Sequence, residues 1–167
     1  LWLNWFTILV QPFRGLRQEE TIAWLNTNGG NLLSGTYEIS DEGGKIVQRF
    51  VEVKNDSVHF YESHFCPDCV GQKRAQYHYF IALKSILYQA VNTIAKKERK
   101  YGAEYILKVA PNTIKYTFNG DGKWYDTEDT NYSIYCGKAN EPDVQRVLKA
   151  IMHLAKLSGA KENKQTF

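Results

Sequence analysis

The sharpest chemical signal in the chain is a pair of cysteines two residues apart, in the sequence Cys66-Pro-Asp-Cys69. A spacing this short lets the two sulfurs bond to each other across a small loop. When the first cysteine of such a pair begins a helix, its thiolate is favoured and thiol–disulfide exchange becomes possible. The pattern therefore leaves open a structural disulfide, two loop thiols and a redox pair. We expect the disulfide.

The redox alternative is strengthened by the residues that precede the pair. The stretch 57–65 (SVHFYESHF) followed by the two cysteines resembles the strand that leads into the active site of glutaredoxin-like proteins. That resemblance implies Cys66 as the nucleophile and Cys69 as the resolving thiol. Such proteins need a βαβ connection after the motif and a cis-proline loop facing the cysteines. Pro111 is the one downstream proline that could serve, and it falls between two strand-like stretches, so thiol–disulfide oxidoreductase stays the alternative function.

The same cysteines could also help to hold a metal ion. His64, Cys66 and Cys69, with Cys136 or His78 as a fourth ligand, would give Zn²⁺ enough nitrogen and sulfur donors. Structural zinc sites usually contain two close ligand pairs, and this chain has one. We keep a small zinc-stabilised domain as a further alternative, expect no cofactor, and expect Cys136 to be a small buried apolar residue.

The other polar clusters predict solvated loops rather than sites. The chain has no GxSxG nucleophile elbow and no phosphate-binding glycine loop. Asp121, Asp126, Glu128 and Asp129 do not have the spacing of an EF-hand loop, and residues 96–100 (KKERK) read as a basic turn. A net charge of +3, from 21 basic and 18 acidic residues, is too balanced to predict a nucleic-acid partner.

Hydrophobic periodicity predicts the elements that must position these residues. A length of 167 residues fits one domain, and an aromatic content of 14% favours sheet over a helical bundle. Asn55-Asp56 and Pro111-Asn112 have the residue types of hairpin turns, and residues 84–95 fit either a strand or a helix, with strands favoured. His59 and His78 are expected to be packed or surface residues of alternating strands. About seven strands are predicted, over residues 35–40, 46–54, 57–65, 77–83, 103–110, 113–119 and 132–136.

Two helices complete the predicted domain. Residues 18–28 predict a short helix, and a long amphipathic helix is expected from residue 141, with Asn140 as its N-cap and Gly159 at its end. Lys149 and His153 lie off its apolar face and should be solvated. The apolar face contains Val144, Val147, Leu148, Ile151, Leu154 and Ala155.

The order of these elements predicts an α+β fold, an antiparallel barrel or sandwich closed by the last helix. Residues 20–25 (ETIAWL) and 147–159 (VLKAIMHLAKLSG) resemble the ends of small exported bacterial proteins of PH-like fold that have no assigned activity. The resemblance implies a PH-like domain over residues 16–160, followed by a tail at 161–167. It implies no catalytic residue.

The first ten residues bear on where the protein is located. Residues 1–10 (LWLNWFTILV) are apolar but about half as long as the roughly 20 residues that span a bilayer. Residues 1–15 therefore read as the remnant of a signal peptide, with a first core segment or a shortened anchor as alternatives. We expect no transmembrane span and a secreted or periplasmic location. The predicted function is a non-catalytic, exported binding or envelope-associated domain for an unknown protein or small-molecule ligand.

Overall fold

The structure of the protein is a computed structural model that describes residues 16–38, 44–66, 74–90, 93–100 and 102–163. Among the named elements, helix α1 (Gln18–Leu32) comes first and helix α2 (Glu141–Leu157) comes last, and the 3₁₀ turn η2 (Leu83–Ser85) lies between them. The strands are β1 (Ser34–Glu38), β2 (Lys45–Lys54), β3 (Ser57–Phe65), β4 (Arg74–Ala82), β5 (Ala95–Arg99), β6 (Gly102–Lys108), β7 (Ile114–Phe118), β8 (Tyr125–Thr127) and β9 (Asn131–Gly137).

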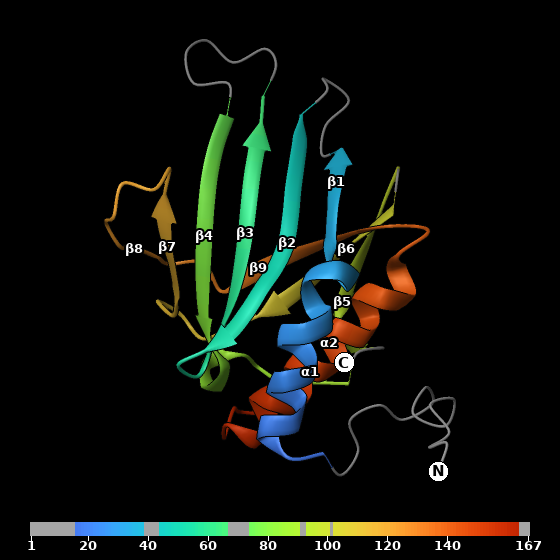
Figure 1. Ribbon diagram of the computed structural model, residues 1–167, viewed down its shortest axis with the longest axis vertical. Helices are drawn as coiled ribbons and strands as arrows, with labels where there is room; N and C mark the ends of the chain where they lie inside the picture. The colour runs from blue at the N-terminus through green and yellow to red at the C-terminus, as the bar shows by residue number, and fades with distance from the viewer. Residues whose placement is uncertain (1–15, 39–43, 67–73, 91–92, 101, 164–167) are drawn as a thin grey trace.

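The strands form two antiparallel sheets. One has six strands in the order β1-β2-β3-β4-β7-β8, and the other has three in the order β5-β6-β9 (Figure 1). The outermost strands of each sheet have no further strand partner among the described residues. The α+β class with antiparallel sheets is confirmed, whereas the closed barrel is wrong, because the sheets pack on each other without joining into one ladder.

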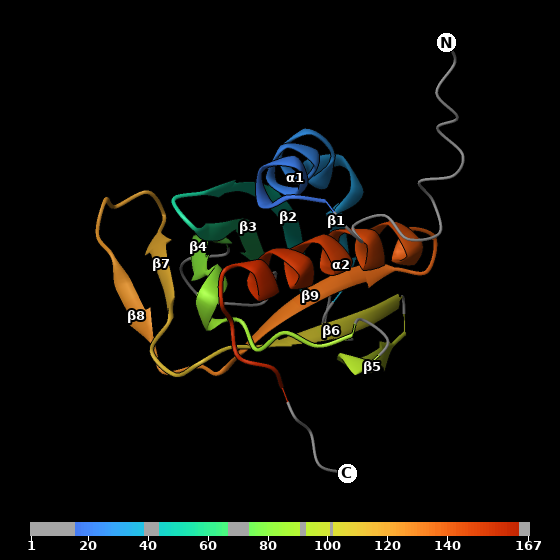
Figure 2. The same ribbon diagram turned by 90° about the horizontal axis from the view of Figure 1, so that it is seen from below.

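The core lies between the six-stranded sheet, the two helices and the smaller sheet. In the view from below, α2 lies between α1 and β9 (Figure 2). We call the face of the six-stranded sheet that carries Phe50, Phe60 and Ile81 the inner face, and the opposite one the outer face. Leu148 and Ile151 of α2 are fully buried, which confirms the apolar face predicted from the 3.6-residue period.

Helix α1 packs closely on β2 at Gly29 and is hydrogen-bonded to it by the side-chain amide of Asn26. A Cβ atom at Gly29 would lie 2.5 Å from Cδ1 of Phe50, so the absence of a side chain lets the helix approach the inner face. The side chain of Asn26 donates to the carbonyl of Val53 at 3.1 Å and accepts from its N–H at 2.7 Å. These bonds satisfy a part of β2 that β1 does not reach.

The β2–β3 hairpin forms where it was predicted. Asn55 and Asp56 have positive φ angles of 51° and 55°, the backbone that a two-residue hairpin turn with the right twist requires. Asparagine and aspartate tolerate this conformation better than other residues with a side chain.

Three local expectations are wrong. Residues 103–110 and 113–119 do not form a hairpin, because β6 pairs with β5 and β9 while β7 pairs with β4 and β8. Residues 96–99 of the expected basic turn belong to strand β5. The described part of 84–95 holds neither a helix of two turns nor a long strand: it contains the end of η2, isolated bridges at Ile86 and Tyr88, and the first residue of β5.

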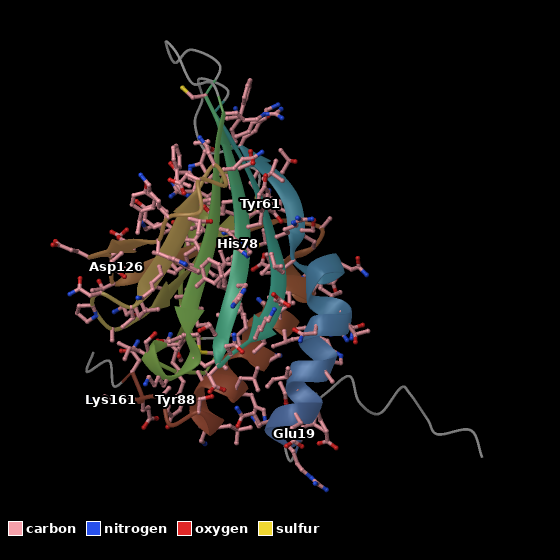
Figure 3. The ribbon with its side chains drawn as sticks, turned by 60° about the vertical axis from the view of Figure 1, so that its left-hand side comes forward. Glu19, Tyr61, His78, Tyr88, Asp126 and Lys161 are labelled. Carbon is pink, nitrogen blue, oxygen red and sulfur yellow. The ribbon has the colours of Figure 1, made fainter. Side chains whose placement is uncertain are left out.

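The segment after α2 docks on the domain for a few residues. The N–H of Tyr88 donates to the carbonyl of Lys161 at 3.1 Å, and the N–H of Asn163 donates to the carbonyl of Tyr88 at 3.0 Å (Figure 3). Residues 164–167 lie outside the described part. No helix among the described residues is both long and apolar enough to cross a membrane.

Candidate functional site

The predicted cysteine pair lies only partly within the described residues. Cys66 directly follows β3, while Cys69 belongs to a stretch outside the described part, so the disulfide between them stays a prediction. Strand β3 pairs with β4 from Ser57–Ala82 to Phe65–Arg74 in antiparallel register. Cys66 therefore directly follows the end of an antiparallel strand that pairs with the next described strand along the chain.

The remaining predicted zinc ligands occupy separate parts of the fold. His64 lies on the inner face of β3, and His78 lies on the outer face of β4. Cys136 lies in β9 and is 2% exposed; burial, with the nearby carboxylate of Glu141 adding to it, raises the pKa of its thiol to about 11. Within the described residues, no three His, Cys, Asp or Glu side chains are arranged to hold a metal ion.

A buried carboxylate on the inner face organises the polar part of the core. Glu62 is 5% exposed, and its Oε1 accepts from the side-chain amide of Gln48 and from the hydroxyl of Tyr132, each at 2.7 Å. Its Oε2 lies 2.8 Å from Nε2 of His64, whose side chain is 38% exposed. One carboxylate thus holds an imidazole at the edge of the inner face and a tyrosine of the other sheet.

Gln48 extends this network to the backbone of β9. Its amide nitrogen donates to the carbonyl of Ser133 at 2.7 Å, and its amide oxygen accepts from the N–H of Tyr135 at 2.9 Å. Within the described part of the chain, strand β9 has no strand partner on that side. The fully buried glutamine therefore satisfies the edge as a neighbouring strand would. These bonds join the two sheets through their polar atoms.

A second buried carboxylate lies on the smaller sheet. Oε1 of Glu104 accepts from the hydroxyl of Ser133 at 2.6 Å, and Oε2 pairs with the guanidinium of Arg99, whose Nε lies 2.9 Å away. Burial alone would raise the pKa of Glu104, but the bonds from Ser133 and Arg99 lower it below the ordinary value. Lys96, which lies on β5 as Arg99 does, pairs with Glu98 and Glu141, each at 2.8 Å.

A set of contacting aromatic rings lies on the inner face of the six-stranded sheet. They occupy inward positions of β4, β7 and β8. Tyr77 and Tyr79 of β4 pair with Phe118 and Tyr116 of β7. Tyr116 pairs in turn with Tyr125 of β8. We call these five residues the tyrosine face. Neighbouring centroids lie 5.3–5.8 Å apart, and the ring planes of Tyr77 with Tyr79 and of Tyr116 with Tyr125 are both inclined by only 21°.

The tyrosine face is not fully covered. Tyr125 is 37% exposed, and the other four rings are half-buried. Tyr79 contacts Tyr132 of β9 at a centroid distance of 5.3 Å, and burial raises the pKa of the Tyr79 hydroxyl far above its ordinary value. Towards β8, the hydroxyl of Tyr125 donates to Asp121 at 2.7 Å. Rings that are open to solvent therefore lie beside buried ones. The carboxylate of Asp121 lies at the β8 end of this surface, and that of Glu62 lies at the β3 end.

Two histidines lie close together on the outer face. The ring centroids of His59 and His78 are 5.8 Å apart, and Nδ1 of His59 lies 3.7 Å from a carboxylate oxygen of Glu52. Figure 3 labels His78 beside Tyr61, its paired residue on β3. Burial lowers the pKa of both imidazoles, and the Glu52 carboxylate opposes the shift in each.

A polar pocket of about 480 Å³ lies at the opposite end of β3 from Cys66. It is formed where the first turn of α1, the β2–β3 hairpin, η2 and the end of α2 meet. Its charged lining residues are Asp56 and Lys84, and Leu157 supplies an exposed apolar side chain. The size suits a small molecule, but neither the tyrosine face nor the buried carboxylates reach it.

The sequence pattern pointed to the cysteines and not to the residues that build these sites. Gln48 and Glu62 occupy inward positions of strands, where a polar residue among alternating apolar ones is a signal of a buried network. The tyrosine face was visible as aromatic residues two apart in residues 77–79 and 116–118, but their junction across three strands required the pairing of β4 with β7.

These features define an α+β domain with a buried polar junction between its sheets and an open aromatic face. No protein-family model, curated protein or solved structure matches the chain.

Proposed function

We propose that the protein is a non-catalytic binding domain whose ligand lies on the tyrosine face. The observation that carries this proposal is the continuous contact of five aromatic rings that the fold leaves partly open to solvent. Contiguous exposed apolar surface opposes solubility and is typical of sites that bind a partner. Tyrosine combines a large apolar ring with a hydroxyl, so it binds ligands that have both kinds of surface.

The chemistry of the rim favours an uncharged ligand rich in hydroxyl groups, such as a saccharide. The apolar C–H faces of a sugar ring can pack on tyrosine rings, while its hydroxyl groups bond to acceptors at the edges. Asp121, beside Tyr125, provides such an acceptor, and the partly exposed imidazole of His64 provides a polar group beside Tyr77. His64 has its centroid 5.0 Å from that of Tyr77, so the imidazole adjoins the aromatic surface.

A binding role is also supported over the thiol–disulfide oxidoreductase alternative. Cys66 follows an antiparallel strand whose next partner along the chain is β4, whereas glutaredoxin-like folds place the cysteine pair before a helix of a βαβ unit. Glu62 and His64 lie on the inner face of β3, shortly before Cys66. Both oxygens of Glu62 already bond to other side chains, namely those of Gln48, Tyr132 and His64.

Three further expectations remain proposals that rest on sequence alone. Export of the domain rests on residues 1–10, and kinship with small exported PH-like proteins rests on residues 20–25 and 147–159. A zinc-stabilised domain rests on the spacing of Cys66 and Cys69.

The test is binding of the full chain to an array of immobilised saccharides. A Tyr77→Ala, Tyr116→Ala double variant removes two rings and should weaken binding by about tenfold or more, since each aromatic contact contributes on the order of 1 kcal/mol. Lys115→Ala is the matched control, because Lys115 lies on the outer face of the strand that carries Tyr116. Equal binding by the double variant and the wild type, or no binding by the wild type, would contradict the proposal.

A further inference from the structure

We propose that His59 and His78 bind a divalent transition-metal ion, specifically Zn²⁺, on the outer face of the six-stranded sheet, with the carboxylate of Glu52 as the third ligand. This site lies on the opposite face of the sheet from the tyrosine face and is independent of it. It also differs from the cysteine-based zinc set considered from the sequence.

The first argument is that both imidazoles have a buried nitrogen without a hydrogen-bond partner. Nδ1 of His59 and Nε2 of His78 are excluded from solvent and unpaired. The His59 side chain is only 9% exposed. Because an unpaired buried polar atom costs free energy, such atoms are rare and require an explanation. A metal ion that accepts a lone pair from each nitrogen satisfies both at once.

The second argument is the arrangement of the three side chains. Glu52 and His59 are direct partners in the β2–β3 ladder, and His78 is the paired residue of Tyr61, one outward position further along β3. The centroid separation of 5.8 Å is short enough for one ion to reach a nitrogen of each ring at the usual distance of about 2.0–2.1 Å. Two imidazoles and one carboxylate are a ligand set that zinc accepts, with water in the fourth position.

The carboxylate is the adjustable member of the set. The three side chains do not already converge on one point, but the Glu52 side chain is 40% exposed and lies 3.7 Å from Nδ1 of His59. A rotation of this exposed side chain would bring its oxygen to the ion without moving the sheet. Two cations face the site: the charge of Lys54 acts on His59 and that of Arg49 acts on His78. The guanidinium carbon of Arg49 lies over the ring of Tyr61, 5.0 Å from its centroid.

Aromatic side chains shield the proposed site. Phe80 contacts both imidazoles, with centroids 4.5 Å from His59 and 4.6 Å from His78. Trp124, which is 59% exposed, packs on Phe80 with a centroid distance of 4.2 Å. An apolar shell restricts the entry of water and lowers the local dielectric, which strengthens the attraction between a cation and a carboxylate.

The experiment is a calorimetric titration of chelator-treated full chain with Zn²⁺ at neutral pH. It is repeated in a Cys66→Ser, Cys69→Ser background, because thiolates would otherwise compete for the ion. We expect one Zn²⁺ per chain in both backgrounds. His59→Gln and His78→Gln should each weaken Zn²⁺ binding by more than the roughly tenfold to hundredfold that loss of an outer-shell partner costs. Glu52→Gln should weaken Zn²⁺ binding less than either histidine variant. Long-range proton–nitrogen NMR spectra should show the ion on the rings of His59 and His78.

The matched control is His153→Gln, which removes the histidine of helix α2. Its affinity for Zn²⁺ should equal that of the parent protein, and thermal melting of each variant without metal checks that it is folded. Absence of Zn²⁺ binding would overturn the proposal. So would binding that survives loss of both outer-face histidines, or binding that disappears when the two cysteines are replaced.

Discussion

The side-chain amide of Asn26 bonds to both backbone groups of Val53, as a neighbouring strand would. Gln48 repeats this arrangement on the other side of the core, where it bonds to the carbonyl of Ser133 and the N–H of Tyr135. Each amide satisfies a stretch of strand that its sheet leaves unpaired. The helix and the smaller sheet are therefore attached to the six-stranded sheet by directional bonds as well as by apolar packing.

Replacement of Gln48 by Ala should lower the free energy of unfolding by about 2–4 kcal/mol, because it removes one bond to the buried Glu62 and leaves the carbonyl of Ser133 and the N–H of Tyr135 without this partner. Urea unfolding followed by circular dichroism measures the effect. Gln76→Ala, at an exposed position of β4, should change stability by no more than about 0.5 kcal/mol. Similar losses for the two variants would show that the junction between the sheets is not held by Gln48.

The apolar face of α2 should dominate the stability of that helix. Leu148→Ala and Ile151→Ala should each cost about 2–5 kcal/mol, because both side chains are fully buried. Lys149→Ala should be silent because the side chain is exposed. Thermal unfolding compares the three variants, and equal shifts would mean that the face is assigned wrongly.

His153 should behave differently from Lys149, although the sequence predicted that both are solvated. Its Nε2 lies 3.1 Å from the carbonyl of Leu16, and the side chain is half-buried. His153→Ala should therefore cost about 1 kcal/mol in urea unfolding, the usual contribution of one hydrogen bond. A variant as stable as Lys149→Ala would show that this contact does not hold the start of α1 to α2.

Glu104 should make the domain sensitive to acid. Its pKa is lowered in the folded state, so its contribution to stability is present above the unfolded value of about 4.3 and is lost as the pH falls through the folded pKa. Glu104→Gln should destabilise the protein by about 1–3 kcal/mol at neutral pH, and the difference from wild type should shrink as the pH is lowered past that range. Urea unfolding over a pH series measures it.

The control for this prediction is Glu98→Gln, since the Glu98 side chain is 76% exposed and pairs with Lys96 at the surface. It should change stability little at any pH. A difference between wild type and Glu104→Gln that stays constant down to low pH would contradict a lowered pKa at Glu104.

Cys136 should be unreactive towards iodoacetamide in the folded protein at neutral pH. Burial raises the pKa of its thiol to about 11 and also excludes the reagent, so very little accessible thiolate is present. Mass spectrometry of the alkylated peptide after increasing times should show modification only under unfolding conditions in guanidinium chloride. Rapid labelling without denaturant would place Cys136 in an accessible environment.

Local sequence determined the elements that depend on neighbouring residues. The 3.6-residue period of α2, the alternation along β2 and β3, and the Asn55-Asp56 turn were all readable because helix faces, strand faces and tight turns are set by residues a few positions apart. The start of α1 at Gln18 was predicted correctly, although its end came later than expected, at Leu32. These elements already exclude an all-helical fold.

The tertiary structure decided which strands pair, and with them the candidate sites. Strands recognise each other through backbone groups that every residue carries, so the sequence of β6 and β7 could not show that they belong to different sheets. Residues 96–99 form strand β5 because β6 offers them a partner, although their charged side chains favour a turn. The tyrosine face, the Gln48–Glu62 junction and the His59–His78 pair each join residues from separate strands, and only the packing of the whole chain brings those residues within contact distance.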